Sequence, residues 1–282
     1  MGGTRVWLVC NPDSGSNDEV AVEQLCEDFA DAGFHVERLV RFPDEDAPSP
    51  SQLDDADVDL LAVFTGDGTI HAVVAAASGW SGAVLVLPGG TMNMLSKRQH
   101  GDVDAKTILS RLRPGAITCT RPSVIRSRHG VALTGVLAGP GTVWNEVREA
   151  MRAKDFVEFL STTRQAISWS ANGPKVRCAE VDGGREEGYA AITVTPQDEG
   201  LQAKGYYAES LADYAGQGIA LLNRDFRDGP HDDLGMHRRV RLTCPDGEPM
   251  GLLLDGEPFD GAAEEEFEMT ACDVDLVMTK HG

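Results

Sequence analysis

One stretch decides the fold of this protein: Leu60-Leu61-Ala62-Val63-Phe64-Thr65-Gly66-Asp67-Gly68-Thr69-Ile70-His71. Its five leading apolar residues predict a buried strand, its two glycines a tight turn, and the apolar spacing that follows a helix. Glycine lets the backbone approach a ligand closely, and the first turn of a helix offers unpaired N–H groups and the positive end of its dipole. The stretch therefore suits a phosphate group, although a plain turn is the other reading in a chain with 31 glycines.

The negative charge of Asp67 does not suit direct contact with a phosphate. A carboxylate and a phosphate are both anions, so they do not bind each other directly. Asp67 would therefore either bridge to the phosphate through a metal ion or take a proton from a nucleophile.

The first half of the chain alternates strands with helices. Strands are predicted over 5–10, 35–40, 60–64 and 83–87, helices over 18–32, 66–78 and 105–112, and a solvated loop with at most a short helix over 42–59. This order implies a parallel sheet with right-handed crossovers, whose ligand lies at the carboxyl ends of the strands. Three polar loops follow strands and therefore meet at that edge: 11–16, 65–69 and 88–95.

The second half, from about residue 119, consists of short strand-like runs separated by turn residues. These runs occupy 131–137, 176–181, 189–194, 218–222, 239–244, 251–254 and 274–278, with a helical insert over 143–168. We therefore expect an α/β N-terminal domain with a parallel sheet over 1–118 and a mainly antiparallel β domain over 119–282.

The charge balance argues against one class of partner. The chain carries 45 acidic and 25 basic residues and a net charge of −20. Nucleic acid demands a cationic face and is therefore not an expected partner. An anionic membrane would repel the chain unless a local basic patch approached it. Three basic clusters could form such a patch or be solvated faces beside acidic residues: Lys97–His100, Arg126–Arg128 and His237–Arg239.

The cysteines and the apolar runs indicate the compartment. Six cysteines are scattered singly without a C-x-x-C pair, which is typical of small buried hydrophobes in a reducing compartment. No signal peptide is visible, and no apolar run approaches the ~20 residues of a membrane-spanning helix. We therefore expect a cytoplasmic protein with no transmembrane segment.

Four loops stand in a defined chain order: Asn11-Pro12-Asp13-Ser14-Gly15, Thr65-Gly66-Asp67-Gly68-Thr69, Pro88-Gly89-Gly90-Thr91-Met92-Asn93 and Asp255-Gly256-Glu257. In this order they resemble the diacylglycerol kinase catalytic-domain family, which includes sphingosine kinases, ceramide kinases and bacterial lipid kinases. The family pattern is N-P-x-S-G, G-G-D-G-T, P-x-G-T-x-N and D-G-E. The resemblance covers essentially the whole chain. It implies a NAD kinase/diacylglycerol kinase-like fold with a nucleotide-binding first domain and a lipid-substrate second domain.

The resemblance also implies roles for single residues. ATP would be held by Asn11, Pro12, Ser14 and Gly15 around the adenine nucleotide, by Thr65, Gly66, Asp67, Gly68 and Thr69 at the phosphates, and by Gly90, Thr91 and Asn93 closing the same cleft. The catalytic set would be Glu257, Asp255 and Asp67. Glu257 would be the general base, a role that related sphingosine kinases give instead to the residue matching Asp67. Asp255-Gly256 is also a common hairpin turn.

The sequence departs from the family pattern at four places. Thr65 replaces the first glycine of G-G-D-G-T, and Met94 stands where the family often has an aspartate. The family's magnesium loop, Leu-Asp-Asp-Gly, has its best counterpart in Leu211-Ala212-Asp213-Tyr214, so Mg²⁺ would be held by Asp67 and Asp213. The chain ends 25 residues after Glu257, which predicts a reduced return of the C-terminus onto the first domain.

The resemblance implies an ATP- and Mg²⁺-dependent lipid kinase that phosphorylates a hydroxyl of diacylglycerol, a sphingoid or a related lipid. The lipid would be presented at the membrane surface, with the protein peripheral at the inner face. Two alternatives stay open. The departures allow a catalytically weak or inactive homologue that binds nucleotide and lipid. NAD kinase shares G-G-D-G, but no Asn-Glu pair stands at the position where that family reads its dinucleotide, and the N-P-x-S-G loop favours the lipid kinases.

Overall fold

The computed structural model describes residues 4–12, 18–90, 92–140, 175–179, 181, 184–189, 191–206 and 231–280. The chain divides into two compact units. The first comprises Met1–Pro122 and Ala271–Gly282, and the second comprises Ser123–Thr270. The sequence placed the boundary at 118/119 and assigned everything after it to the second domain, whereas the structure returns the last twelve positions, 271–282, to the first unit.

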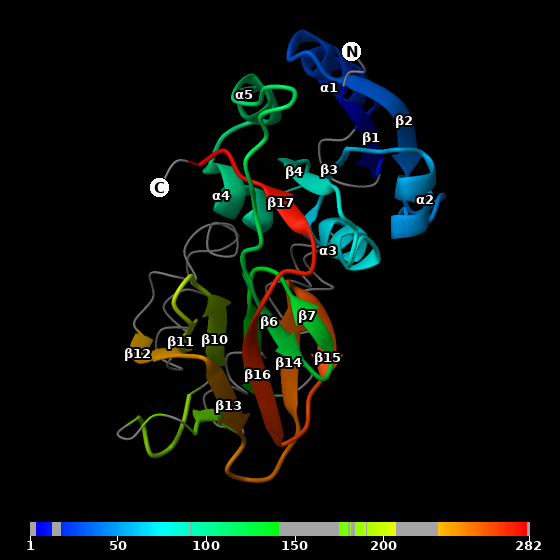
Figure 1. Ribbon diagram of the computed structural model, residues 1–282. Coiled ribbons are helices and arrows are strands. Elements are labelled where there is room, and N and C mark those ends of the chain that lie inside the picture. Colours follow the sequence, from blue (N-terminus) through cyan, green and yellow to red (C-terminus); the bar gives the residue numbers. More distant parts are fainter. Residues whose placement is uncertain are drawn as a thin grey trace. The chain divides into compact units, whose positions relative to one another are not determined.

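The first unit is built on a six-stranded sheet in the order β2-β1-β3-β4-β17-β5 (Figure 1). Its strands are β1 (Arg5–Cys10), β2 (His35–Arg41), β3 (Leu60–Thr65), β4 (Ala83–Pro88), β5 (Cys119–Thr120) and β17 (Asp275–Val277). Strands β2, β1, β3, β4 and β17 pair in parallel, and β5 runs antiparallel to β17. The predicted parallel sheet is therefore confirmed.

β17 lies within the predicted strand-like run 274–278, and it returns to the sheet of the first unit. It pairs with the edge of β4 that would otherwise lie open, and its Leu276 and Val277 are fully buried. An exposed strand edge carries unpaired backbone groups, so the short C-terminal strand stabilises the sheet at this edge.

Five helices accompany the sheet: α1 (Glu19–Asp31), α2 (Pro50–Asp55), α3 (Asp67–Ala76), α4 (Met94–His100) and α5 (Ala105–Ser110). α1 begins where the Asp18 carboxylate accepts from the N–H of Ala21 and ends before Gly33, whose φ of +85° suits a helix terminus. α2 is the short helix expected within 42–59 and begins with a capping box of Ser49 and Gln52. α4 was not predicted.

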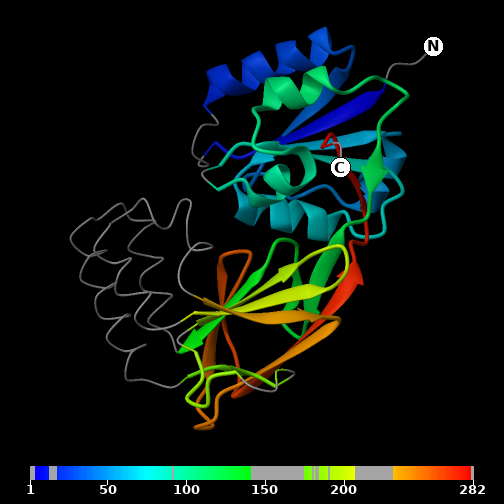
Figure 2. The same cartoon turned by 90° about the vertical axis from the view of Figure 1, so that its left-hand side faces the viewer.

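β3 lies in the middle of the sheet, and all six of its residues are buried. Leu60, Ala62 and Phe64 pack into a core with apolar residues of α1 and α5. The two helices lie together on one face of the sheet, and α3 covers the other (Figure 2). Coverage of both faces explains the continuous apolar run of β3, since strands of parallel sheets are buried on both sides.

The described residues of the second unit form two antiparallel sheets, ordered β12-β11-β10-β8-β14-β15 and β7-β6-β16-β13-β9. The first sheet contains β8 (Val136–Pro140), β10 (Ala191–Pro196), β11 (Leu201–Tyr206), β12 (His231–His237), β14 (Met250–Leu254) and β15 (Glu257–Asp260). The second contains β6 (Ser123–Ser127), β7 (Gly130–Ala132), β9 (Arg177–Cys178), β13 (Arg239–Thr243) and β16 (Glu264–Ala271). Residues from both sheets form one apolar core, which confirms the predicted antiparallel β architecture.

Several expectations for the second half change. The predicted run 131–137 is divided into β7 and β8 by the segment 133–135, and β6, β11, β12, β15 and β16 were not predicted. The helical insert over 143–168 and the strand over 218–222 lie outside the described residues. Among the described helices, none is long and apolar enough to cross a membrane.

Candidate active site

The residues that directly follow β1, β3 and β4 lie at one edge of the sheet. Cys10, at the end of β1, pairs in register with Phe64, and Thr65, at the end of β3, pairs with Pro88 at the end of β4. The side-chain amide of Asn11 donates to the hydroxyl of Thr69 at 3.1 Å, so the residue after β1 is bonded to the first turn of α3.

The turns after β3 and β4 touch through their glycines. A Cβ atom placed on Gly90 would lie 2.6 Å from the Cα of Gly66, a separation that real Cβ atoms do not show. Gly66 itself has a φ of −77° and therefore needs no left-handed conformation. Close backbone approach, and not an unusual dihedral angle, explains the glycine at position 90.

Asn93 holds the second turn closed. It adopts a left-handed conformation with φ of 52°, which asparagine tolerates better than most residues. Its Oδ1 accepts from the N–H of Gly90 and its Nδ2 donates to the carbonyl of Gly90, both at 2.8 Å. The residue therefore closes the turn with its side chain and starts α4 with its backbone.

Asp67 joins the starts of two helices. It is the first residue of α3, and its Oδ1 accepts from the N–H of Met94, the first residue of α4, at 2.8 Å. The contact uses the backbone of Met94, so it does not require the aspartate that the family often carries there. Sequence reasoning weighed only the side chain at 94 and missed this contact.

The first turn of α3 presents an anion-binding geometry. Its N-cap is Gly66, and no side chain caps the helix. A helix start without a side-chain cap directs backbone N–H groups outward, and the helix dipole adds partial positive charge. Thr65 is fully buried, and its hydroxyl donates to the carbonyl of Gly66, so threonine fits where the family pattern has glycine.

Comparison with known proteins identifies this unit. The model of the diacylglycerol kinase catalytic domain matches residues 5–121. Residues 5–121 belong to the diacylglycerol kinase catalytic-domain family. The match spans β1 to β5, and with them every loop of the first unit described above.

Solved structures resemble almost the whole chain in fold, and not only residues 5–121. A candidate diacylglycerol kinase from Bacillus anthracis strain Sterne superimposes with a TM-score of 0.64 at 18% identity, covering 99% of this chain and 98% of that chain. A second structure, of a diacylglycerol kinase from the same strain, gives 0.62 at 17% identity with the same coverage. No curated protein matches the chain. At these identities the superpositions show a shared fold.

Asp255 and Gly256 form the two-residue turn between β14 and β15, in which Leu254 pairs with Glu257. Both turn residues have positive φ, 51° and 88°, as an Asp-Gly hairpin turn requires. The Asp255 carboxylate accepts hydrogen bonds from the segment 133–135. Glu257 is half-buried at the start of β15. The hairpin interpretation of Asp255-Gly256 is therefore correct, and the motif places Glu257 directly after a fixed turn.

Four of the predicted site residues lie outside the described residues: Ser14, Gly15, Thr91 and Asp213. Pro12 lies in an exposed turn directly after Asn11. Within the part of the chain that the structure describes, no three His, Cys, Asp or Glu side chains are grouped as a metal site would require. Among these described residues, Asp67 is therefore not part of such a group.

Two buried titratable groups of the first unit have shifted pKa values. His100, at the end of α4, is 1% exposed, and burial lowers its pKa to about 4. Its Nδ1 lies 3.0 Å from the hydroxyl of Thr279 in the C-terminal segment. Burial also raises the pKa of the Cys10 thiol, against the opposing charge of Arg41, so this thiol beside Asn11 stays protonated at neutral pH.

The basic clusters pair with acids. Arg128 bonds Glu265, Arg239 lies 3.4 Å from Glu266, and Lys97 lies 3.6 Å from Asp102. These contacts favour the reading of solvated faces beside acidic residues over that of a lipid-headgroup patch.

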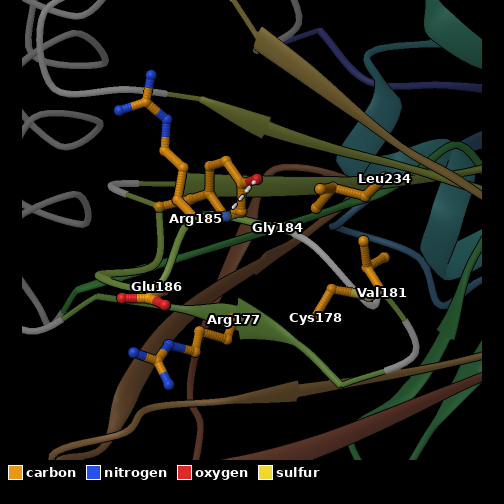
Figure 3. Close-up of a pocket in the computed structure, with 8 residues that line it drawn as sticks. Arg177, Cys178, Val181, Gly184, Arg185, Glu186 and Leu234 are labelled. Atoms are coloured by element: carbon orange, nitrogen blue, oxygen red, sulfur yellow. Dashed lines mark hydrogen bonds between the residues drawn. The ribbon is translucent and has the colours of Figure 1, made fainter.

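A small pocket in the second unit contains none of the predicted site residues. It has a volume of about 180 Å³ and lies beside Cys178, Val181 and Leu234, with charged side chains around it (Figure 3). The N–H of Arg185 donates to the Tyr189 hydroxyl at 3.2 Å in its wall.

Proposed function

We propose that the protein is an ATP-dependent lipid kinase that transfers the γ-phosphoryl group to a hydroxyl of diacylglycerol, a sphingoid or a related lipid. The observation that carries the proposal is the contact between the turns after β3 and β4, where Gly66 and Gly90 pack backbone to backbone beside the uncapped start of α3. The arrangement lies within a diacylglycerol kinase catalytic domain.

The residues of the first unit fit an adenine nucleotide. The start of α3 offers N–H groups and dipole charge to phosphate oxygens. We assign Asn11 and Pro12, with Ser14 and Gly15, to the nucleotide itself, and the glycine turns with Thr69, Thr91 and Asn93 to its phosphates. Bound ATP supplies the phosphoryl group, and the protein supplies orientation and charge neutralisation.

A magnesium ion fits this site in the manner usual for phosphoryl transfer. Mg²⁺ is commonly bound by one or two carboxylates together with substrate phosphates and not by a cage of protein ligands. Asp67 is the carboxylate beside the phosphate-binding turn, and its hydrogen bond to the N–H of Met94 fixes its orientation. We assign Asp67 to the ion, with Asp213 as the second carboxylate.

The lipid hydroxyl must lose its proton as it attacks. We propose that Glu257 accepts this proton, because Asp67 is held between two helix starts and Glu257 follows a turn fixed by Asp255. The carboxylate needs only to orient the hydroxyl in line with the γ-phosphate. Asp67 as the proton acceptor is the competing assignment.

The test is a kinase screen. Purified full-length protein is incubated with ATP, Mg²⁺ and a total lipid extract, and new phosphorylated lipids are detected by mass spectrometry. We expect phosphorylated products from one lipid class. Exchange of Asp67 for Asn and of Glu257 for Gln should each lower kcat by about 10²-fold or more. Loss of the acid limb of the pH–rate profile in only one variant identifies the proton acceptor.

Binding of ATP by calorimetry without transfer to any lipid in the extract would contradict the proposal. That outcome would instead support a nucleotide-binding homologue that has lost catalysis. Formation of NADP from NAD in a coupled assay would place the protein with the NAD kinases.

A further inference from the structure

The carboxylate of Asp255 is occupied by the backbone of its own unit. Its Oδ2 accepts from the N–H of Leu133 at 2.7 Å. Its Oδ1 accepts from the N–H of Thr134 at 2.8 Å, from the hydroxyl of Thr134 at 2.7 Å and from the N–H of Gly135 at 3.1 Å. A carboxylate offers about two lone-pair positions on each oxygen, so three donors occupy Oδ1 fully and one donor holds Oδ2. A substrate hydroxyl would have to displace one of these donors to reach Oδ1, and the bond from Leu133 holds Oδ2 towards the backbone of its own unit.

The same contacts fasten two segments that are far apart in the sequence. The N–H of Asp255 donates to the carbonyl of Gly135 at 3.0 Å, which adds a bond in the opposite direction. Leu133 and Thr134 are 5% and 9% exposed, so water does not compete for these donors. The segment 133–135 leads into β8, and β8 pairs with β14 along its whole length. The network therefore fixes the β14–β15 turn against the sheet that carries it.

The fixed turn determines the position of Glu257. Glu257 is the first residue of β15 and pairs with Leu254, the last residue of β14, across the Asp255-Gly256 turn. Asp255 has a left-handed φ of 51°, a conformation that its four hydrogen bonds hold in place. If the bonds are lost, the turn relaxes and Glu257 moves with it.

We infer that Asp255 is a positioning residue and not a proton acceptor: its hydrogen-bond network with 133–135 sets the place of Glu257. The inference rests on the proposed lipid kinase function with Glu257 as the proton acceptor. It gives the aspartate and the glutamate of the D-G-E motif different tasks.

Three variants test the inference. Asp255→Asn replaces an accepting oxygen with a donating NH₂ that must face an N–H group. Thr134→Val removes one donor and leaves both carboxylates unchanged. Asp246→Asn is the control, because Asp246 is exposed and also precedes a glycine with positive φ, Gly247, in a turn.

We expect Asp255→Asn to lower the unfolding midpoint by about 3–8 °C, because buried donors lose their acceptor. Below that transition its kcat should fall about tenfold with an unchanged KM for ATP, and the acid limb of its pH–rate profile should stay at the wild-type pH. Thr134→Val should show smaller losses of both kinds with the same pH profile. Added to Glu257→Gln, Asp255→Asn should lower kcat less than twofold further, since residues that act through one another are not additive.

The inference is overturned if Asp255→Asn abolishes the acid limb while its unfolding midpoint equals that of Asp246→Asn. It is equally overturned if the tenfold loss recurs in full in the Glu257→Gln background. If wild-type protein phosphorylates no lipid, the proposed function fails by itself. The unfolding midpoints still test the network in that case, because an Asp255→Asn midpoint equal to that of Asp246→Asn contradicts it.

Discussion

Replacement of Gly90 by alanine tests the contact on which the phosphate site depends. The new Cβ would lie 2.6 Å from the Cα of Gly66. An ordinary van der Waals contact begins near 3.4 Å, so the two turns must separate by about 0.8 Å. The obstacle is backbone and not the end of a flexible side chain, so it cannot rotate away.

The size of the effect follows from this displacement. Overpacking costs roughly 1–3 kcal/mol of folding stability. A misplacement of about 1 Å at a site that orients reacting groups lowers the rate by roughly 10²-fold. We therefore expect Gly90→Ala to raise the dissociation constant for ATP at least tenfold and to lower kcat, while the protein still folds at 25 °C.

The control separates a lost site from lost stability. Gly115 has a φ of +76° and open space around its Cα, so Gly115→Ala strains the backbone without touching the turns. It should cost about 1–2 kcal/mol of stability and leave ATP binding unchanged. Calorimetric ATP titrations and denaturant unfolding of both variants make the comparison. If Gly90→Ala binds ATP as tightly as the wild type, the contact between the two turns has no role in nucleotide binding.

Two further predictions concern α4 and its ends. The pKa of His100 is lowered from 6.5 to about 4, so the unfolded chain binds a proton that the folded protein does not. The contribution of His100 to the free energy of unfolding should therefore be fully present above pH 6.5. The free energy of unfolding should fall by up to about 3 kcal/mol as the pH is lowered towards 4. Denaturant unfolding at several pH values should show a smaller fall in His100→Gln than in a His35→Gln control, and an equal fall would contradict the burial argument. Asn93→Ala removes both hydrogen bonds to Gly90 and places a residue with less tolerance for the left-handed conformation there. Chemical denaturation should show a loss of about 2 kcal/mol in the free energy of unfolding, and ATP should bind more weakly. Unchanged values would show that the turn closes without Asn93.

The edge of the first sheet could be predicted because its signals are local. Apolar runs that end in glycine turns, such as Leu60–Gly66, mark strand ends, and parallel topology brings the ends of such strands to one edge. The contacts inside that edge could not be predicted in the same way. The bond between Asp67 and Met94 uses a backbone N–H, which leaves no trace in residue types. α4 escaped prediction because its sequence, Met94–His100, has no amphipathic spacing and starts from a left-handed asparagine.

The strands of the second unit show a different limit. β16 carries glutamates at 264, 265, 266 and 268, and glutamate is depleted in strands, so the composition gives no strand signal. In the structure, Glu268 and Glu266 lie across from Arg239 and Arg241 of β13. Arg239 lies 3.5 Å from Glu268, and Arg241 lies 3.7 Å from its diagonal neighbour Glu264. Such cross-strand pairing depends on a partner distant in sequence, so it could not be inferred from either segment alone.

The positioning role inferred for Asp255 also depends on a partner that is distant in sequence. The motif D-G-E indicates a hairpin turn and a carboxylate pair, but it does not reveal which carboxylate is already bonded. The segment 133–135 is more than 100 positions away in the chain and supplies all four donors.

One measurement tests the central claim most directly: transfer of label from γ-labelled ATP into the lipid-soluble fraction of a cell extract by the purified protein with Mg²⁺. We predict labelled lipid that accumulates with wild-type protein and is absent with Asp67→Asn, whose circular dichroism should match that of the wild type. No labelled lipid with folded wild-type protein, or equal labelling by folded Asp67→Asn, would contradict the assignment of the turn after β3 to phosphoryl transfer.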